Sequence, residues 1–490
     1  MSDLDLLLSR LQSPDRPLTG AADDSRQVQP GDLFLAYPGH SADGRQYIAA
    51  ALAKGAAAVL WEEGDGFSWN PAWAVPHLGL RGLRQLAGPL AHLIHRRPSE
   101  QLSLIAITGT NGKTTISQSL GRSHPARCAM IGTLGAGFSG ALQDTGFTTP
   151  EATTLMRYLA DFQSAGARAC ALEASSIGIA EGRMNGARVD VAVFTNFTRD
   201  HLDYHGTMAE YAAAKARLFA WPRLRLAVVN LDDELGRRLA LETTALKVVG
   251  YTLGSERSPL PATIRAEDLR STGDGQAFTL ATPHGRAEVR TAVLGRYNIA
   301  NLLAVAAVLQ DAGLTVDDIA ARLAALPPPA GRMERYGHHG EPLVAVDYAH
   351  TPDALENALI ALRPQAEARG GQLFCVFGCG GERDRGKRPE MGRIATRLAD
   401  RVWLTNDNPR SEDPAEILAE IQGGAPAAEV EADRRLAIRR AVLAADAADV
   451  ILVAGKGHES YQDIAGIRYP FADGEEVRAA LAARQEGRHP

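Results

Sequence analysis

The sequence predicts an α/β protein built from three domains. Its 490 residues are about two to three times the usual length of one domain, so more than one hydrophobic core is expected. Short apolar segments typical of buried strands alternate with helix-like segments, and this alternation predicts parallel sheets covered by helices on both faces. Prolines at position 98 and at positions 327–329 divide the alternation into three parts.

The first part, residues 1–98, is predicted to be a small α/β domain. Apolar strands are expected at 33–36 and 56–60, with an alanine-rich helix at 47–55 between them. A further helix at 80–95 ends before Pro98, because the residue preceding a proline disfavours helical backbone.

The second part, residues 99–328, has the signature of a parallel sheet. Its strands are expected at 104–108, 169–172, 189–195 and 226–230, and a helix at 315–326 precedes the proline run. The third part, residues 329–490, is predicted to be a doubly wound, Rossmann-like domain, because each of its apolar strands is followed by a polar or glycine-rich turn. These strands lie at 343–347, 373–377, 402–405 and 450–453.

Composition narrows the classes of function. The formal charge of -6 comes from 58 acidic and 52 basic residues, which argues against binding a nucleic acid or an anionic membrane. The first ten residues carry acids where a signal peptide needs bases, and no apolar run approaches the roughly 18 residues of a membrane span. We therefore expect a cytoplasmic protein without a membrane span.

The four cysteines are too few for a disulfide scaffold, so reduced thiols are expected. Cys375 and Cys379 could form half of a zinc site, but no second Cys or His pair follows at ligand spacing. The simpler interpretation is that both are small core residues.

A phosphate-binding loop follows the strand at 104–108. Glycines allow backbone N–H groups to converge on phosphate oxygens, Lys113 offsets the charge of the β- and γ-phosphates, and Thr114 can hold Mg²⁺. The loop is more compact than the common form of this motif, and an ordinary ATPase or GTPase would also satisfy it. Its residues are Gly109, Thr110, Asn111, Gly112, Lys113, Thr114 and Thr115.

Three polar residues near the central strands indicate chemistry beyond hydrolysis. Glu173 ends the strand at 169–172, His201 follows the strand at 189–195, and Lys215 lies in a helix at 211–219. Ligands of parallel sheets bind at the carboxyl ends of strands. From the residues alone, Glu173 and His201 are metal ligands or hydrogen-bonded interior residues, and Lys215 is a solvated lysine.

Together with strings at 24–26, 30–34, 230–233, 295–301 and 331–334, these motifs resemble the Mur ligases over nearly the full length of the chain. Those enzymes form amides with ATP in bacterial cell-wall precursor synthesis. The resemblance implies that Glu173 and His201 bind Mg²⁺ with Thr114, and that Lys215 is carbamylated to N6-carboxylysine and holds a second metal. It implies ATP and Mg²⁺ as cofactors, with Lys113, Glu173, His201 and Lys215 as the catalytic residues.

The resemblance also implies two sets of binding residues. The ATP site would include the phosphate loop with Asn298, Asn301, Arg332, Asp347 and His350. A UDP-linked substrate would contact Ser25, Arg26, Thr148, Thr149, Ser175 and Arg183. Two departures from the family pattern are Ile177, where histidine is usual, and Glu382, where aspartate is commoner; Ile177 removes any hydrogen bond from that position.

Two strings in the third part suggest the amine substrate. The segment 378–389 could be mistaken for a dinucleotide fingerprint, but its Arg/Lys-rich continuation favours an anion site. With 407–410 and 455–459 it resembles the Mur ligases that add meso-2,6-diaminopimelate to UDP-N-acetylmuramoyl-L-alanyl-D-glutamate. The residues implied for diaminopimelate are Arg383, Asp407, Asn408, Pro409, Arg410, Gly455 and Glu459.

Guanidinium groups suit the far carboxylate of that amino acid and Glu459 suits its ammonium. L-Lysine would leave Arg410 unpaired, at a penalty of about 1–3 kcal/mol or more. The alternatives are a surface role for Arg410, an L-lysine-adding Mur ligase, another superfamily member such as a folylpolyglutamate synthase, and a nucleotide-gated binding protein without turnover. A monomer is expected.

Overall fold

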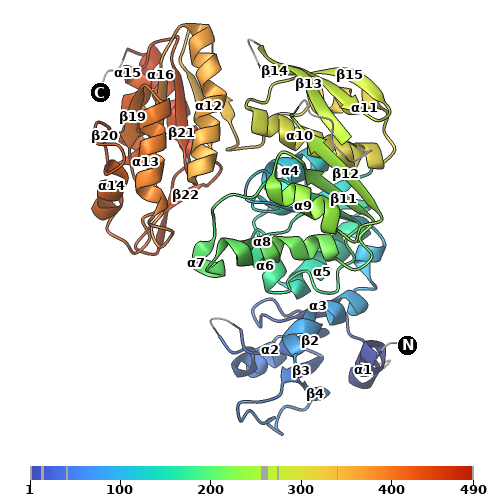
Figure 1. Ribbon diagram of the computed structural model, residues 1–490. Coiled ribbons are helices and arrows are strands. Elements are labelled where there is room, and N and C mark those ends of the chain that lie inside the picture. The colour runs from blue at the N-terminus through green and yellow to red at the C-terminus, as the bar shows by residue number, and fades with distance from the viewer. Residues whose placement is uncertain are drawn as a thin grey trace.

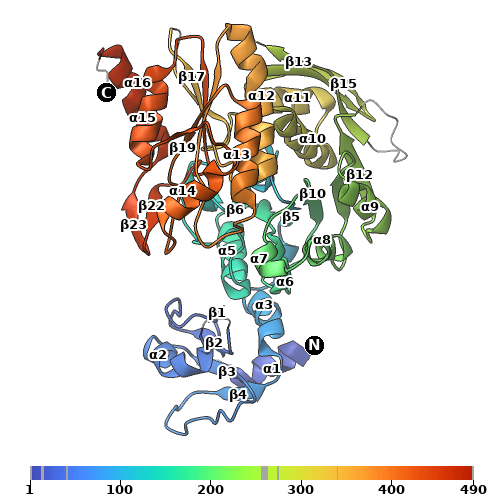
Figure 2. The same ribbon diagram turned by 60° about the vertical axis from the view of Figure 1, so that its left-hand side comes forward.

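The computed structural model describes residues 3–12, 16–39, 42–254, 263–272, 275–338 and 340–487, so the outermost residues of the first and third predicted domains lie outside it. Three sheets follow one another along the chain. In Figure 1 the N-terminal sheet lies at the bottom, the central sheet above it, and the C-terminal sheet beside the upper part. Figure 2 shows the same three bodies after rotation. The predicted three-domain α/β class is confirmed.

The N-terminal sheet has four parallel strands in the order β1-β2-β3-β4. The predicted strands and helices in this region are confirmed, while α1, β1 and β4 are short or half-exposed and were not predicted. The elements are α1 (Asp3–Leu11), β1 (Gly20–Ala22), β2 (Asp32–Ala36), η1 (Gly44–Tyr47), α2 (Ile48–Ala53), β3 (Ala58–Glu62), β4 (His77–Leu80), α3 (Leu83–Ile94) and η2 (Pro98–Glu100).

The central sheet has eleven strands in the order β15-β14-β13-β12-β11-β10-β5-β9-β6-β7-β8. The predicted strands correspond to β5 (Ser103–Thr108), β9 (Ala169–Glu173), β10 (Val191–Phe194) and β11 (Leu226–Asn230). These four are parallel, as are β6 (Cys128–Gly132), β12 (Lys247–Thr252) and β13 (Thr263–Thr272) with their inner neighbours.

The prediction of a wholly parallel central sheet was wrong, because antiparallel strands extend the sheet at both of its edges. They are β7 (Gly135–Phe138), β8 (Ala141–Gln143), β14 (Gly275–Thr282) and β15 (Gly285–Thr291). Much of β13 and most of β15 alternate between buried and exposed residues. Half-exposed antiparallel strands lack the continuous apolar run by which buried parallel strands are detected.

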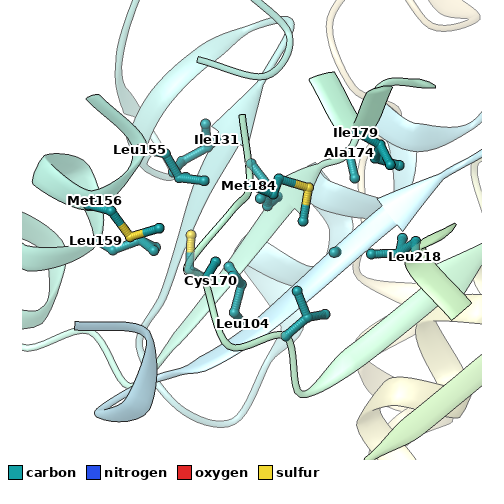
Figure 3. Packing of buried hydrophobic residues seen from close by; sticks show 14 of the residues in the cluster. Leu104, Ile131, Leu155, Met156, Leu159, Cys170, Ala174, Ile179, Met184 and Leu218 are labelled. Carbon is teal, nitrogen blue, oxygen red and sulfur yellow. The ribbon is translucent and has the colours of Figure 1, made fainter. Parts of the chain in front are cut away.

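Side chains of β5 alternate between two cores, one on each face of the central sheet. Leu104 and Ala106 join one core, and Ile105 and Ile107 the other. The first core, shown in Figure 3, includes Leu104 and residues of α5 (Ala152–Ser164) such as Leu155, and it also contains residues of α3. The N-terminal sheet is thereby joined to the central one through shared apolar packing rather than through a flexible linker alone.

The second face of the central sheet is covered by three helices, α4 (Lys113–Ser123), α10 (Arg296–Asp311) and α11 (Val316–Ala324). The helix predicted around Lys215 is α8 (Met208–Ala216) followed by η3 (Arg217–Ala220). Smaller helices near the strand ends are α6 (Ser176–Ala180), α7 (Leu202–His205) and α9 (Glu234–Glu242).

The C-terminal sheet has the order β16-β17-β21-β18-β19-β20, with only β16 antiparallel to its neighbour. Its strands are β16 (Glu334–Tyr336), β17 (Leu343–Asp347), β18 (Leu373–Phe377), β19 (Arg401–Leu404), β20 (Glu429–Val430) and β21 (Val450–Ala454). One face packs on α12 (Pro352–Arg369), α13 (Lys387–Leu398) and α14 (Pro414–Gln422), and the other on α15 (Arg434–Ala444) and α16 (Asp473–Gln485). The doubly wound prediction is confirmed.

Outside this sheet, β22 (Tyr461–Ile464) and β23 (Ile467–Pro470) form a separate hairpin that was not predicted. Cys375 and Cys379 are buried in the C-terminal core, and all four cysteines are free. Within the part of the chain that the structure describes, no helix combines the length and apolarity needed to cross a bilayer.

Candidate functional site

The phosphate loop joins β5 to α4 and is held by the loop that follows β10. Gly109 has a φ of +146°, and a Cβ there would lie 1.7 Å from Thr195 Oγ1, so a larger residue would clash. The backbone N–H groups of Thr110 and Asn111 donate to the carbonyl and side-chain oxygens of Asn196, each at 2.9 Å. These contacts fix the loop at the centre of the sheet, where the strand order reverses direction.

Lys113 folds back over this loop. Its ammonium donates to the carbonyls of Gly109 at 2.8 Å and Thr110 at 2.9 Å. Burial lowers the pKa of Lys113, while the nearby Glu173 and Asp200 act in the opposite direction. The ammonium is therefore a partly desolvated charge on the phosphate loop, next to the position that a bound phosphate would occupy.

Glu173 ends β9 beside the phosphate loop, and its side chain is 1% exposed. One carboxylate oxygen accepts from Ser117 Oγ and the Thr133 N–H, each at 3.2 Å, and the other accepts from Thr114 Oγ1 at 2.9 Å and Thr133 Oγ1 at 3.1 Å. Four donors thus compensate for the loss of water around this buried carboxylate.

The donors around Glu173 fit magnesium. The Thr114 hydroxyl and the Glu173 carboxylate are hard oxygen ligands next to the phosphate loop, and Mg²⁺ commonly takes one or two carboxylates together with phosphate oxygens and water. Among the residues that the structure describes, no group of three or more His, Cys, Asp or Glu side chains is arranged to hold a metal ion. A metal here would depend on the bound nucleotide for its remaining ligands.

His201 and Lys215 lie close enough to Lys113 for its charge to act on both. His201 has left-handed backbone (φ +53°), and its Nε2 lies 3.5 Å from Asp200 Oδ2. Burial lowers the pKa of His201, so the ring is neutral near pH 7 and able to coordinate a metal.

Lys215 is only 1% exposed, and its ammonium lies 4.3 Å from the centre of the Tyr211 ring. It forms no ion pair with any residue in the described ranges. Burial lowers the pKa of Lys215 well below its ordinary value, and the charge of Lys113 lowers it further. A neutral amine can add to CO₂ to form a carbamate, whereas an ammonium cannot ligate a metal, so Lys215 fits a metal site only after modification.

A pocket of about 460 Å³ lies beside the phosphate loop. We call it the loop pocket. Asn298 and Asn301, from α10, are buried in its wall and hydrogen-bonded to each other at 3.3 Å. A Cβ on Gly112 would lie 2.4 Å from Asn301 Oδ1, so the loop and α10 touch directly. The predicted residues that line this pocket are Asn111, Gly112, Thr115, Asn298, Asn301, Arg332 and Asp347.

The C-terminal sheet supplies the opposite wall of the loop pocket. Arg332 donates to Thr114 Oγ1 at 3.3 Å, and its guanidinium packs 4.6 Å from the centre of the Tyr348 ring. Burial raises the pKa of Asp347 to about 6, although Arg332 and the Met333 N–H act in the opposite direction. The pocket therefore joins residues of two sheets across the phosphate loop.

A second pocket, of about 260 Å³, lies at the carboxyl ends of the C-terminal strands and extends to Asp200 and His201. We call it the strand-end pocket. It gathers Arg383, Asp407, Asn408, Arg410, Gly455 and Glu459, all predicted for diaminopimelate. Pro409 does not line it.

His350, predicted for ATP, lines the strand-end pocket instead of the loop pocket. Burial lowers the pKa of His350 to about 4, and Lys387 contributes to the same shift. The ring is therefore neutral, and it lines the same pocket as Asp200 and His201 of the central domain and Arg383 and Arg410 of the C-terminal domain.

A third pocket, of about 630 Å³, lies between the N-terminal and central sheets. The predicted residues Ser25, Arg26 and Arg183 line it. Arg183 pairs with Glu181 at 2.6 Å and donates to the Thr149 carbonyl at 2.9 Å. Thr148, Thr149 and Ser175 are absent from this lining; Thr149 instead donates to the Glu173 carbonyl at 2.7 Å and approaches Ser175 Oγ at 2.9 Å.

Several residues of these sites were not predicted. Three of them, Asp200, Lys387 and Lys456, lie within motifs identified in the sequence, but no role was predicted for these three side chains. Thr133 had no local signal, because it reaches Glu173 only through the pairing of β6 with β9. Tyr348, which lines both the loop pocket and the strand-end pocket, could have been suspected from its place directly after β17.

The fold and the site define a class of protein: a three-domain α/β protein in which a phosphate loop at the centre of one sheet meets the strand ends of another. Three segments match models of Mur ligase domains: residues 19–85 the Mur ligase catalytic domain, 107–309 the middle domain and 331–457 the glutamate ligase domain.

Two curated proteins named UDP-N-acetylmuramoyl-L-alanyl-D-glutamate–2,6-diaminopimelate ligase are 49% identical to this chain. The one from Chromobacterium violaceum covers 96% of both chains, and the one from Pseudomonas aeruginosa covers 94% of both. A solved structure titled with the same enzyme name has a TM-score of 0.67 at 38% identity, over 97% of this chain and 96% of its own. MurF ligase from Thermotoga maritima, solved with ADP, has a TM-score of 0.67 at 19% identity over 100% of both chains, which supports the fold alone. The chain belongs to the Mur ligase family.

Proposed function

We propose that this chain is an ATP-dependent ligase that joins meso-2,6-diaminopimelate to the D-glutamyl γ-carboxylate of UDP-N-acetylmuramoyl-L-alanyl-D-glutamate. The reaction belongs to peptidoglycan precursor synthesis and takes place in the cytoplasm on a monomer. The observation that carries the proposal is that the loop pocket and the strand-end pocket share Tyr348, and that the strand-end pocket also reaches Asp200, whose charge acts on Lys113 of the phosphate loop. The strong similarity to relatives named for this reaction supports the choice of substrates.

The three pockets suit three substrates. ATP occupies the loop pocket with its phosphates on residues 109–115, the UDP-linked dipeptide occupies the pocket between the N-terminal and central sheets, and diaminopimelate occupies the strand-end pocket. The corresponding domains are residues 1–98, 99–328 and 329–490. The phosphate loop and the strand-end pocket then bring ATP and the amine together near Lys113, where the central and C-terminal parts of the chain meet.

The chemistry proceeds in two stages. The γ-phosphoryl group of ATP passes to the substrate carboxylate, giving an acyl phosphate; the amine of diaminopimelate then attacks the acyl carbon, and phosphate leaves as the amide forms. Lys113 offsets negative charge on the phosphoryl group. Asp200 and His201 border the space from which the amine approaches.

Magnesium would be held by Thr114, Glu173 and His201, and carbamylated Lys215 would help to hold a second ion. When bound, these ions offset the repulsion between the phosphates and the carboxylate. Burial of Lys215 supports the carbamate, because it favours the neutral amine that reacts with CO₂.

Arg383 and Arg410 favour an amine substrate with a far carboxylate. Arg410 is half-buried, donates to the Gly381 carbonyl and lines the strand-end pocket. L-Lysine would leave this guanidinium without a carboxylate partner, and a site built for a polar group can reject an analogue lacking it by up to about 10⁴-fold.

The proposal is tested with purified protein, ATP, Mg²⁺ and UDP-N-acetylmuramoyl-L-alanyl-D-glutamate in a screen of meso-diaminopimelate, L-lysine, D-alanyl-D-alanine and L-glutamate. Phosphate release and product mass are measured. We expect release with diaminopimelate at least about 100-fold faster than with the other amines. Preference for another amine would indicate a different ligase of the superfamily, and nucleotide binding without release would indicate a binding protein.

A further inference from the structure

A buried lysine lies directly beneath the strand-end pocket. Lys456 follows β21, its side chain is 0% exposed, and it does not line the pocket itself. Its ammonium donates to Asn408 Oδ1 at 2.9 Å and to Glu459 Oε2 at 2.8 Å. One buried cation therefore contacts two of the residues that the proposed function places around the amino acid.

These contacts determine how Asn408 presents its amide. Asn408 Oδ1 accepts from Lys456 and also from the backbone N–H of Asp463 at 3.0 Å, so the oxygen must face inward. The amide nitrogen then donates to Glu459 Oε2 at 2.7 Å. An amide turned the other way would point two N–H donors at an ammonium and a backbone N–H, which is unfavourable.

The same contacts orient Glu459. Both donors, Lys456 and Asn408, engage Oε2. Within the described residues Oε1 accepts no hydrogen bond, and the Glu459 side chain is 18% exposed on the pocket wall. The carboxylate is thus held at one oxygen from below while its other oxygen remains available to a ligand in the pocket.

The charges on the pocket wall match a ligand end that carries both an ammonium and a carboxylate. Arg383 and Arg410 suit the carboxylate, and the oriented oxygen of Glu459 suits the ammonium. Without Lys456, the Glu459 carboxylate and the Asn408 amide would lose the group that fixes both, and each could rotate. The arginines would be unaffected, since they are held by other contacts, such as that of Arg410 with the Gly381 carbonyl.

We propose that Lys456 is a positioning residue for substrate specificity: it holds Glu459, directly and through Asn408, in the arrangement in which the free carboxylate oxygen of Glu459 binds the distal ammonium of the diamino dicarboxylic acid. This inference rests on the proposed function and deepens it. It predicts a defect confined to recognition of one amine, whereas a lysine that only stabilises the C-terminal domain would affect every amine substrate alike.

The test compares two substrates that differ only in that amine. Meso-diaminopimelate carries the distal ammonium, and L-2-aminopimelate has both carboxylates and the reacting amine but lacks it. In Lys456→Met, kcat/KM for diaminopimelate should fall by about 10- to 100-fold, the range expected for lost hydrogen bonds to charged groups. For L-2-aminopimelate it should change by less than about threefold, and KM for ATP should not change.

Matched variants complete the test. Lys247→Met removes an exposed lysine of β12 that pairs with Asp311 at 3.3 Å, and it should leave both substrates unaffected. Glu459→Gln should reproduce the selective loss, and the double variant Lys456→Met/Glu459→Gln should add little to it, because the two residues act as one unit. If Lys456→Met does not fold, as judged by circular dichroism, Lys456→Gln replaces it, since it keeps one donor at that position.

A selective loss for diaminopimelate supports the inference. Equal losses for both substrates, or no loss for either, overturn it. Failure of the proposed function is a separate result, because wild-type protein would then show no diaminopimelate-dependent phosphate release before any variant is made.

Discussion

Replacement of Glu173 by glutamine removes a charge while keeping the local packing. The two carboxylate oxygens each accept two hydrogen bonds, and only one of the four donors, the Thr133 N–H, is unable to act as an acceptor instead. A glutamine whose oxygen takes the place of Oε1 still accepts from Ser117 Oγ and Thr133 N. Its NH₂ group replaces Oε2 and donates to the hydroxyls of Thr114 and Thr133, which rotate to accept.

All four contacts are therefore retained in Glu173→Gln. Exchanging charged for neutral hydrogen bonds weakens them, but the cost of burying the carboxylate also disappears, so the free energy of unfolding should change by no more than about 1 kcal/mol. Catalysis should respond very differently. Loss of the charge that holds the metal beside the phosphates should reduce kcat by about 100- to 1000-fold, the effect of removing one electrostatic stabiliser of a transition state.

The assay is phosphate release from ATP with diaminopimelate and the UDP-linked dipeptide over a range of Mg²⁺ concentrations, with urea unfolding as the measure of stability. We expect the variant to need far more Mg²⁺ for any activity. Glu242→Gln, at an exposed glutamate of α9 paired with Arg238 at 3.7 Å, is the control. Wild-type activity and Mg²⁺ dependence in Glu173→Gln, or unfolding of that variant, would refute the reasoning.

Two further predictions follow from the contacts around the site. Lys215→Ala should lower the rate of phosphate release by at least about 100-fold, because the buried lysine no longer supplies a carbamate. Added acetate or formate should restore part of this activity, whereas chloride at the same ionic strength should not. Full activity of the variant without added carboxylate would contradict the carbamate. Arg199 and Asp384 form an ion pair at 3.0 Å that joins the loop before His201 to the C-terminal loop that carries Arg383, with side chains 55% and 27% exposed. An exposed ion pair contributes about 0.2–1 kcal/mol, so Arg199→Asp and Asp384→Arg should each raise KM for diaminopimelate by up to about fivefold. The double variant, which restores opposite charges, should recover the wild-type KM. If the two increases in KM simply add in the double variant, the ion pair does not couple the two loops.

The sequence alone determined the α/β class and the strands at the centre of each large sheet. Residues 226–230, 343–347 and 373–377 were predicted as strands with the same limits that β11, β17 and β18 have in the structure. Such strands are buried on both faces, so each is a continuous apolar run whose ends are marked by polar or glycine residues. The phosphate loop could also be predicted from the sequence, because a phosphate is bound by consecutive backbone groups between one strand and one helix.

Tertiary structure decided what long-range pairing brings together. Thr133 contacts Glu173 because β6 pairs with β9, and Lys456 contacts Asn408 because β21 and β19 end at the same edge of the C-terminal sheet. It also placed His350 in the strand-end pocket and the antiparallel strands at the ends of the central sheet. None of these contacts leaves a local pattern, because a side chain's partners across a sheet depend on strand order and register, whereas the sequence records directly only the burial of each strand and the composition of each turn.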